Sequence, residues 1–258
     1  VTGIATAYMD STPVVFVTGN VPQSLMGTDS FQEADISGMT MPITKHNYLV
    51  TNVDRLAETI REAFYIAKSG RPGPVVLDFA KNAQTGTVEY EPATVDFIRS
   101  YDPDRQADLS DIMCAAKMIN DSVKPFALVG QGVELGDACP ELQAFLEKAD
   151  IPCGTTFLGL SAIPSDHRLN MGILGMHGNL GPNVMTNQCD LLIAIGMRFD
   201  DRVTGNLATY AKQAKIIHFD IDPAEFNKNV QVDLKVLGNC KQTLAAVTQN
   251  IDSATHSA

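Results

Sequence analysis

The chain has 258 residues, 45% of them hydrophobic, which is enough to form one large domain or two ordinary ones. Its 19 lysines and arginines are outnumbered by 30 aspartates and glutamates, and the net charge of −11 argues against a nucleic-acid partner. No apolar run approaches the roughly 20 residues that a membrane-spanning helix needs, so we expect no membrane partner. The five cysteines lack CxxC spacing, which indicates reduced thiols and a cytoplasmic location.

Residues 1–82 are expected to form helix, strand, loop, strand, helix and strand in that order. Small and apolar residues at helical spacing fill positions 1–10, without an initiator Met or an N-cap, and lead directly into a strand at 13–19. We therefore expect an internal fragment that starts within a domain. Further strands are expected at 43–50 and 74–79, and this alternation predicts a parallel sheet covered by helices.

Two signals limit this first domain. Asn52 can cap its long helix, which Gly70 would end. Residues 83–107 then interrupt every periodicity with glycine, prolines and acidic residues, as expected of an extended linker. The apolar face of the helix would carry Val53, Leu56, Ile60, Ala63, Phe64 and Ala67.

Strands and helices alternate again over residues 108–258. Ser110 is expected to cap the first helix, and the buried face of that helix would carry Ile112, Met113, Ala116 and Ile119. Five strands and the intervening helices indicate a complete doubly wound unit of the α/β class. The expected strands are 126–129, 151–155, 191–195, 216–221 and 236–237, and two of the helices are 139–149 and 241–251.

The most informative segment follows the apolar strand at 191–195. Ligands of an open parallel sheet bind just past the carboxyl ends of its strands. Two arginines at that place could hold an anion, with the neighbouring carboxylates fixing their orientation. A solvated loop with internal ion pairs fits the same residues. The strand ends in Gly196 and is followed by Arg198, Asp200, Asp201 and Arg202.

Two other strand ends carry candidate nucleotide contacts. Gly130, Gln131 and Gly132 join a strand to a helix and leave room for backbone to approach a phosphate, although a plain tight turn explains them equally well. Asp220 ends a later strand, where an acidic side chain can accept hydrogen bonds from a ribose. Alternatively it begins a short helix, for which Asp222 is the better cap.

Single residues in polar loops complete the candidates. Glycines flank Met176 and His177, and Met176 either fills space or covers a flat ring. One histidine without neighbouring ligands does not indicate a metal site, and we expect none. Phe31 interrupts the polar loop at 27–33 and needs a partner, either its own domain or another. Arg71 lies at a helix end, where a cation can serve as a cap.

Six segments carry a family pattern in the family's order: residues 1–5, 27–33, 43–47, 70–74, 174–178 and 198–205. Together they resemble the FAD-containing acetolactate synthases (acetohydroxyacid synthases, large or catalytic subunit) of the thiamine-diphosphate enzymes. The resemblance implies that residues 1–82 are the C-terminal part of a pyrimidine-binding domain and 108–258 a complete, Rossmann-like central FAD-binding domain. It also places the catalytic glutamate before Val1, and a third domain with a diphosphate- and magnesium-binding motif after Ala258. We therefore expect no turnover by this chain alone.

The resemblance also implies roles for individual residues. Ser11 and Gln32 would lie near thiamine diphosphate, Phe31 would line the substrate pocket beside Gln32, and Arg71 would reach the FAD. At Asn239 the family usually has aspartate, so contacts to adenosine there lose a charge. The residues around the FAD would be Gly130, Gln131, Gly132, Thr156, Phe157, Leu174, Gly175, Met176, His177, Gly196, Met197, Arg198, Phe199, Asp200, Asp220, Ile221, Asn239 and Cys240. The substrate channel would include Pro22, Lys45, Lys81, Met176, Asp201 and Arg202.

The reaction implied by the resemblance is the decarboxylation of pyruvate on thiamine diphosphate and condensation with a second 2-keto acid, pyruvate or 2-ketobutyrate, for branched-chain amino-acid biosynthesis. FAD would have a structural role, Mg²⁺ would be needed by the intact enzyme, and a homo-oligomer with a small regulatory subunit is expected. Two alternatives stay open. One is a related carboligase or decarboxylase, such as glyoxylate carboligase, and the other is a non-catalytic nucleotide-binding module.

Overall fold

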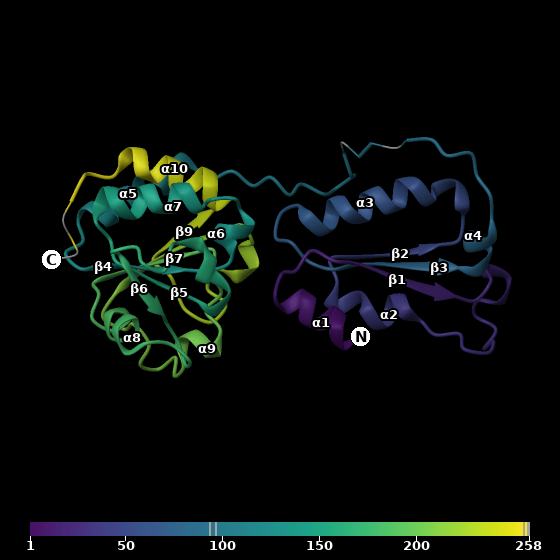
Figure 1. The fold of residues 1–258 in the computed structure, drawn as a ribbon, viewed down its shortest axis with the longest axis horizontal. Helices are drawn as coiled ribbons and strands as arrows, with labels where there is room; N and C mark the ends of the chain where they lie inside the picture. The colour runs from purple at the N-terminus through teal and green to yellow at the C-terminus, as the bar shows by residue number, and fades with distance from the viewer. Residues whose placement is uncertain (93, 96, 255, 257–258) are drawn as a thin grey trace. The chain divides into compact units, whose positions relative to one another are not determined.

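The computed structural model describes residues 1–92, 94–95, 97–254 and 256. It divides the chain into two compact units, Val1–Pro103 and Asp104–Ala258. Each unit is built on a parallel sheet with helices packed on it, which confirms the predicted α/β fold class (Figure 1). Within the described residues, no helix combines the length and the apolar composition needed to cross a bilayer.

The first unit is a three-stranded sheet in the order β1-β3-β2, covered by α3 on one face and by α1 and α2 on the other (Figure 1). The strands begin level with one another, because Val15 and His46 both pair with Val75. Loops before and after the strands therefore lie at opposite edges of the sheet, roughly 20 Å apart. The elements are α1 (Thr2–Met9), β1 (Val15–Asn20), α2 (Ile36–Thr40), β2 (His46–Val50), α3 (Leu56–Lys68), β3 (Val75–Ala80) and α4 (Lys81–Thr85).

The helical segment that ends in α3 has the predicted N-cap, but one residue that we expected to be buried is exposed. The side chain of Asn52 accepts a hydrogen bond from the Asp54 amide at 2.9 Å. Phe64, which we expected to be buried, is 51% exposed, and Ile66 is buried instead. Successive helical residues are rotated by about 100°, so Phe64 lies just outside the buried arc that is centred near Ala63.

A lysine caps the end of α3. Lys45 Nζ donates hydrogen bonds to the carbonyl oxygens of Ile66 and Ser69, the latter at 2.6 Å, and to Tyr101 Oη at 3.0 Å. Tyr101 comes from the segment predicted as an extended linker, and its ring packs against Tyr65 with centroids 6.1 Å apart. The last part of that segment is therefore anchored to the first unit, and its first residues are helical in α4.

The second unit is a six-stranded parallel sheet in the order β6-β5-β4-β7-β8-β9. This is the Rossmann strand order, in which the direction of winding reverses between the strands called β4 and β7 here. We predicted five strands and missed the edge strand β6, which is only half-buried and contains Gly172 at φ +99°. The elements are α5 (Leu109–Asn120), β4 (Pro125–Val129), α6 (Gly132–Leu135), α7 (Cys139–Ala149), β5 (Cys153–Thr155), β6 (Asn170–Ile173), α8 (Leu180–Thr186), β7 (Leu191–Ile195), α9 (Asp201–Thr204), β8 (Lys215–Asp220), β9 (Leu234–Leu237) and α10 (Cys240–Asn250).

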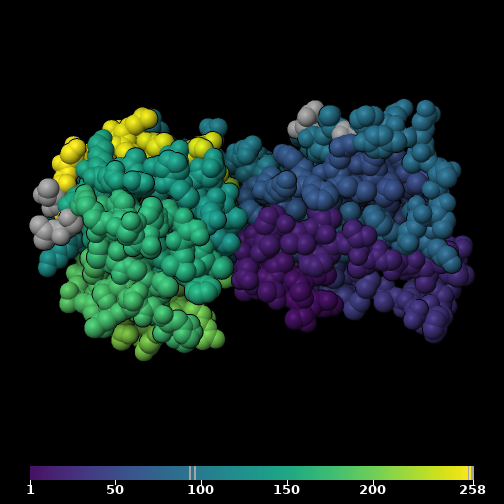
Figure 2. All heavy atoms as spheres, viewed as in Figure 1, coloured from purple at the N-terminus to yellow at the C-terminus, as the bar shows by residue number. Residues whose placement is uncertain are grey.

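Alternate residues of these strands pack into two separate cores. Ile193 and Phe219 belong to the core that the sheet forms with α5, α7 and α10. Leu192 and Ala194 belong to the core on the other face. In the space-filling view, the teal and yellow atoms of this helical layer form the upper surface of the second unit (Figure 2). The sheet is therefore covered on both faces, as expected for parallel strands.

Two details of α5 correct the prediction. Asp108 rather than Ser110 caps the helix, since its carboxylate accepts a hydrogen bond from the Ser110 amide at 2.8 Å. Met113, predicted to be buried, is 50% exposed, whereas Ala115 is fully buried. Met113 lies about 100° around the helix from Ile112, outside the arc that faces the sheet.

The capping lysine of α3 makes the stability of the first unit depend on pH. Burial lowers the pKa of Lys45 to about 8. Between this value and an unfolded-state pKa of about 10.4, the unfolded chain binds more protons, so the contribution of Lys45 to the free energy of unfolding rises with pH. We expect the unfolding free energy of the unmodified chain, minus that of Lys45→Met, to increase between about pH 7 and pH 10. Urea denaturation at each pH measures this difference. Lys68→Met, at the exposed last residue of α3, is the control and should show no such gain. A difference in unfolding free energy between the unmodified chain and Lys45→Met that stays constant or decreases with pH would contradict this expectation.

Candidate functional site

The carboxyl edge of the second sheet is held together by backbone contacts between its turns. The Gly130 amide donates to the Ile195 carbonyl at 2.9 Å, and the Gly132 amide donates to the Gly196 carbonyl at 2.8 Å. The Gly196 amide in turn donates to the Phe219 carbonyl at 2.9 Å. The turns that follow β4, β7 and β8 are therefore fixed relative to one another at the point where the winding of the sheet reverses.

The glycines of these turns are required by this close approach. A Cβ atom on Gly130 would lie 2.3 Å from the Gly196 carbonyl oxygen, and one on Gly132 would lie 2.7 Å from the Gly196 Cα. Gly196 itself has φ +56°, which favours glycine. This contact is enough to account for the three glycines, as expected of a tight turn, and the predicted phosphate contact stays a prediction.

The turn after β5 adds exposed apolar groups to the same edge. The Thr156 amide donates to the Val129 carbonyl at 2.9 Å, and the Thr156 hydroxyl accepts from the Gly159 amide at 3.2 Å. These contacts fix the start of a 3-10 helix, on which Phe157 is 72% exposed. The neighbouring Thr155 hydroxyl is buried and has no hydrogen-bond partner among the described residues. A hydroxyl of this kind can be satisfied by a bound ligand or water.

Two predicted site residues from distant segments meet in the next loop. The Met176 amide donates to the Arg202 carbonyl at 2.7 Å, and Arg202 Nη1 lies 3.4 Å from Met176 Sδ. Gly175, at φ +92°, allows this approach, because a Cβ there would lie 2.5 Å from the Arg202 carbonyl oxygen. Met176 is 60% exposed, and His177 beside it is exposed as well. Leu174, at the start of the loop, is buried.

The charged residues after β7 pair with one another. Arg198 Nη2 lies 3.6 Å from Asp200 Oδ2, and Arg202 Nε lies 3.9 Å from Asp201 Oδ2. Asp200 also caps α9 by accepting hydrogen bonds from the Arg202 and Val203 amides at 3.1 and 3.2 Å. Asp200 thus accepts hydrogen bonds from the backbone as well as pairing with Arg198, whose side chain is 28% exposed.

Asp220 lies at the same edge, at the end of β8. One of its oxygens accepts a hydrogen bond from the Asp222 amide at 2.8 Å, and the other lies 3.5 Å from Nε2 of the buried His218. Burial, with the charge of Asp220 as a smaller cause, raises the pKa of the Cys240 thiol to about 12. Asn239 caps α10 by accepting from the Lys241 amide at 2.8 Å. Sequence reasoning missed His218, because one histidine in an apolar strand is typical of a core residue.

The remaining predicted site residues of this unit are buried or half-buried. Phe199 is buried, and its ring packs edge-on against Tyr210 with centroids 6.2 Å apart. Met197 is also buried, whereas Gln131 and Ile221 lie in half-buried turns. The predicted residues of the second unit therefore gather at one edge of the sheet, although only some present side chains to solvent.

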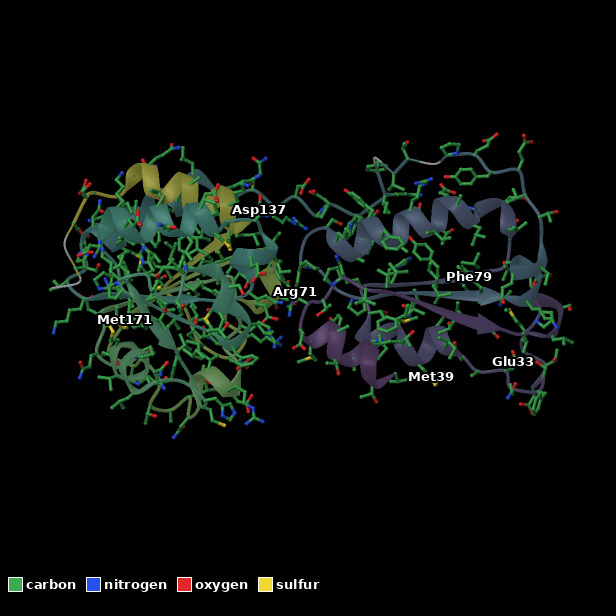
Figure 3. All side chains as sticks on the ribbon, in the orientation of Figure 1. Glu33, Met39, Arg71, Phe79, Asp137 and Met171 are labelled. Atoms are coloured by element: carbon green, nitrogen blue, oxygen red, sulfur yellow. The ribbon has the colours of Figure 1, made fainter. Side chains whose placement is uncertain are left out.

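The predicted residues of the first unit fall at opposite edges of its sheet. Arg71 Nε donates to Ser11 Oγ at 3.0 Å, and both residues precede strands, as Lys45 does. Pro22 and Lys81 follow strands. Glu33, in the loop after β1, and Arg71 lie at opposite ends of the unit (Figure 3).

The loop after β1 presents the most exposed aromatic ring of this unit. Phe31 is 88% exposed, and Gln32 next to it adopts φ +62°, which is uncommon for a residue with a side chain. Glu33, which sequence reasoning did not single out, accepts hydrogen bonds from the Gly27 and Ser30 amides. The bond from Gly27 is the largest of the effects that lower the pKa of Glu33. An ionised Glu33 thus fixes the loop that presents Phe31.

No group of three or more His, Cys, Asp or Glu side chains is arranged to hold a metal ion in the part of the chain that the structure describes. We therefore assign none of the described residues to a metal.

Comparison with known proteins matches residues 112–247 to the family model described as "Thiamine pyrophosphate enzyme, central domain". The chain is 48% identical over 248 residues to a probable acetolactate synthase large subunit of Methanocaldococcus jannaschii. The aligned region covers 95% of this chain and 42% of that protein. The acetolactate synthase large subunit of Corynebacterium glutamicum is 46% identical over 96% of this chain and 40% of its own. The acetolactate synthase large subunit of Mycobacterium tuberculosis is 45% identical over 99% of this chain and 41% of its own length. The chain thus spans about two fifths of the length of these relatives.

The backbone contact at Gly196 predicts a large effect of a single methyl group. Gly196→Ala should lower the free energy of unfolding by about 2 kcal/mol or more, because the new Cβ meets the backbone of Gly132 and the residue must keep a positive φ. Gly181→Ala, in α8, is the matched control, since a Cβ there has open space and alanine favours the helix. Denaturant unfolding of both variants measures the difference. Equal stability of the two variants would show that the contact is unimportant.

Proposed function

The chain belongs to the thiamine pyrophosphate enzyme family, and from this we propose that it is part of an acetolactate synthase large subunit. The observation that carries the proposal is the combination of the central-domain match within the second unit and the identity of 45–48% to proteins of that name. The similarity extends over 95–99% of this chain, so it includes the first unit as well as the second.

The proposed reaction joins two 2-keto acids, pyruvate with either a second pyruvate or 2-ketobutyrate, after loss of carbon dioxide from the first. Thiamine diphosphate, when bound, supplies the electron sink for the decarboxylation. The first unit contributes Phe31 and Gln32, which would contact substrate and cofactor from a loop fixed by Glu33. We assign no step to Mg²⁺ and no residue of this chain to its coordination.

The second unit supplies groups that suit FAD. Phe157 and Met176 are exposed apolar side chains at the carboxyl edge, where a flat ring could cover them. The side chain of Arg198 is partly exposed, so its guanidinium could pair with a phosphate, and the carboxylate of Asp220 could accept a hydrogen bond from a ribose hydroxyl. The buried hydroxyl of Thr155 needs a partner that a ligand could provide. We propose a structural role for FAD, as the resemblance to the acetolactate synthases implies.

The names of the relatives also suggest an assembly. They are called large subunits, which implies a smaller subunit beside them. We propose that the intact protein containing this chain is a homo-oligomer that can take up such a regulatory subunit.

FAD binding by the isolated chain tests the role of the second unit. At FAD concentrations about 100 times the Kd, binding should raise the free energy of unfolding by about 2.7 kcal/mol. Arg198→Met should weaken binding, because a cation facing the phosphate is lost. Lys117→Met, which removes a cation on the exposed face of α5, should leave binding unchanged. Flavin fluorescence and thermal unfolding report both effects. The absence of any shift at saturating FAD would reject the flavin site.

The exposed ring of Phe31 gives a second test, in a chain of the full length of the relatives that contains these 258 residues. That chain should form acetolactate, and the 258-residue chain should not. Phe31→Ala should change the free energy of unfolding of the 258-residue chain by less than about 0.5 kcal/mol, since the ring is exposed. In the longer chain it should lower kcat/KM by about tenfold or more. Acetolactate formation by the 258-residue chain, or full activity of the variant, would contradict the assignment.

A further inference from the structure

We propose that His218 is a positioning residue, which holds the turn after β7 and the end of β8 in the arrangement that receives FAD. The inference rests on the proposed flavin site. It concerns a fully buried residue that would act on the flavin through Met197 and Asp220, and it assigns His218 a task beyond filling the core.

The imidazole of His218 is fully buried and fixed from two sides. The rings of Phe199 and Phe226 lie 5.1 and 5.2 Å from it, centroid to centroid, at interplanar angles of 71° and 89°. Edge-to-face contacts of this kind restrict how a ring can turn. The nitrogen atoms of His218 therefore keep a defined direction in the core between the sheet and its covering loops.

That direction brings one nitrogen to two different elements. Nε2 lies 2.9 Å from the carbonyl oxygen of Met197 and 3.5 Å from Asp220 Oδ2. A carbonyl oxygen can only accept, so Nε2 carries a hydrogen and donates it to Met197. Nδ1 is buried and has no hydrogen-bond partner among the described residues. The polar contacts of the ring are thus directed entirely to the turn after β7 and to the end of β8.

The hydrogen bond from His218 to Met197 links β7 to β8 beyond the point where their strand pairing ends. The pairing of β7 with β8 ends at Ile195 and Phe219, and the Gly196 amide makes the last backbone bond. Met197 follows, and its carbonyl is held by the side chain of His218 instead of by a strand. Arg198 comes directly after this anchored carbonyl, so His218 fixes the distance between the proposed phosphate contact and the proposed ribose contact.

Two substitutions separate the hydrogen bond from the ring. His218→Phe keeps an aromatic ring between Phe199 and Phe226 but loses the N–H, and we expect the Kd for FAD to rise about tenfold. His218→Gln offers a carboxamide N–H at a similar reach and should recover at least part of this loss. Phe219→Leu is the matched control, because it disturbs a fully buried ring on the opposite face of β8. It should lower stability while leaving the Kd within about twofold.

Hydrogen exchange without FAD provides a readout that does not depend on the flavin site. In His218→Phe, amides of residues 196–204 should exchange at least several-fold faster, while those of β4 keep their protection. Phe219→Leu should not show this selective loss. If the unmodified chain fails to bind FAD but the selective loss occurs, the flavin proposal falls and the positioning role stands. If exchange is unchanged, or if His218→Phe binds FAD as tightly as the unmodified chain, His218 is a core residue only.

Discussion

The candidate site of the second unit depends on one contact, the direct approach of backbone to backbone between the turns after β4 and β7. Gly130 and Gly132 meet Gly196 at distances that no Cβ would permit. Because the chain reverses its winding at this place, the contact decides where both turns go. It also ties them to β8 through the Phe219 carbonyl, and so it fixes Arg198 and Asp220 at one edge of the sheet.

The same contact explains why the turns after β4 and β7 contain glycines. In the Rossmann arrangement, glycines also let a pyrophosphate approach the backbone. Here the close approach of Gly130 and Gly132 to Gly196 requires all three glycines by itself. The candidate contacts of a ligand are therefore better sought among the side chains at this edge, of which Phe157 and Met176 are exposed.

How far the sequence predicted the molecule depends on the strength of each local signal. β7 was predicted at its observed limits, because five consecutive apolar residues between Asp190 and Gly196 have few alternatives. β6 was missed, because a half-buried edge strand with Asn170 and Gly172 has the composition of a loop. The site residues were identified through motifs and resemblance, but motifs do not encode contacts. That Asp200 serves as a helix cap and that His218 bridges two elements required coordinates.

Two exposed aromatic side chains lie on segments that are already ordered by hydrogen bonds. Phe31 and Phe157 each leave a large ring in water, and burial of such a ring contributes about 1.5–3 kcal/mol. Both rings stand on loops already ordered by hydrogen bonds, through Glu33 in one unit and Thr156 in the other. A partner or ligand that covers them would lose little of that gain to the ordering of the loop. Order in these two segments together with exposure of their rings agrees with the proposal that a ligand or partner covers Phe31 and Phe157.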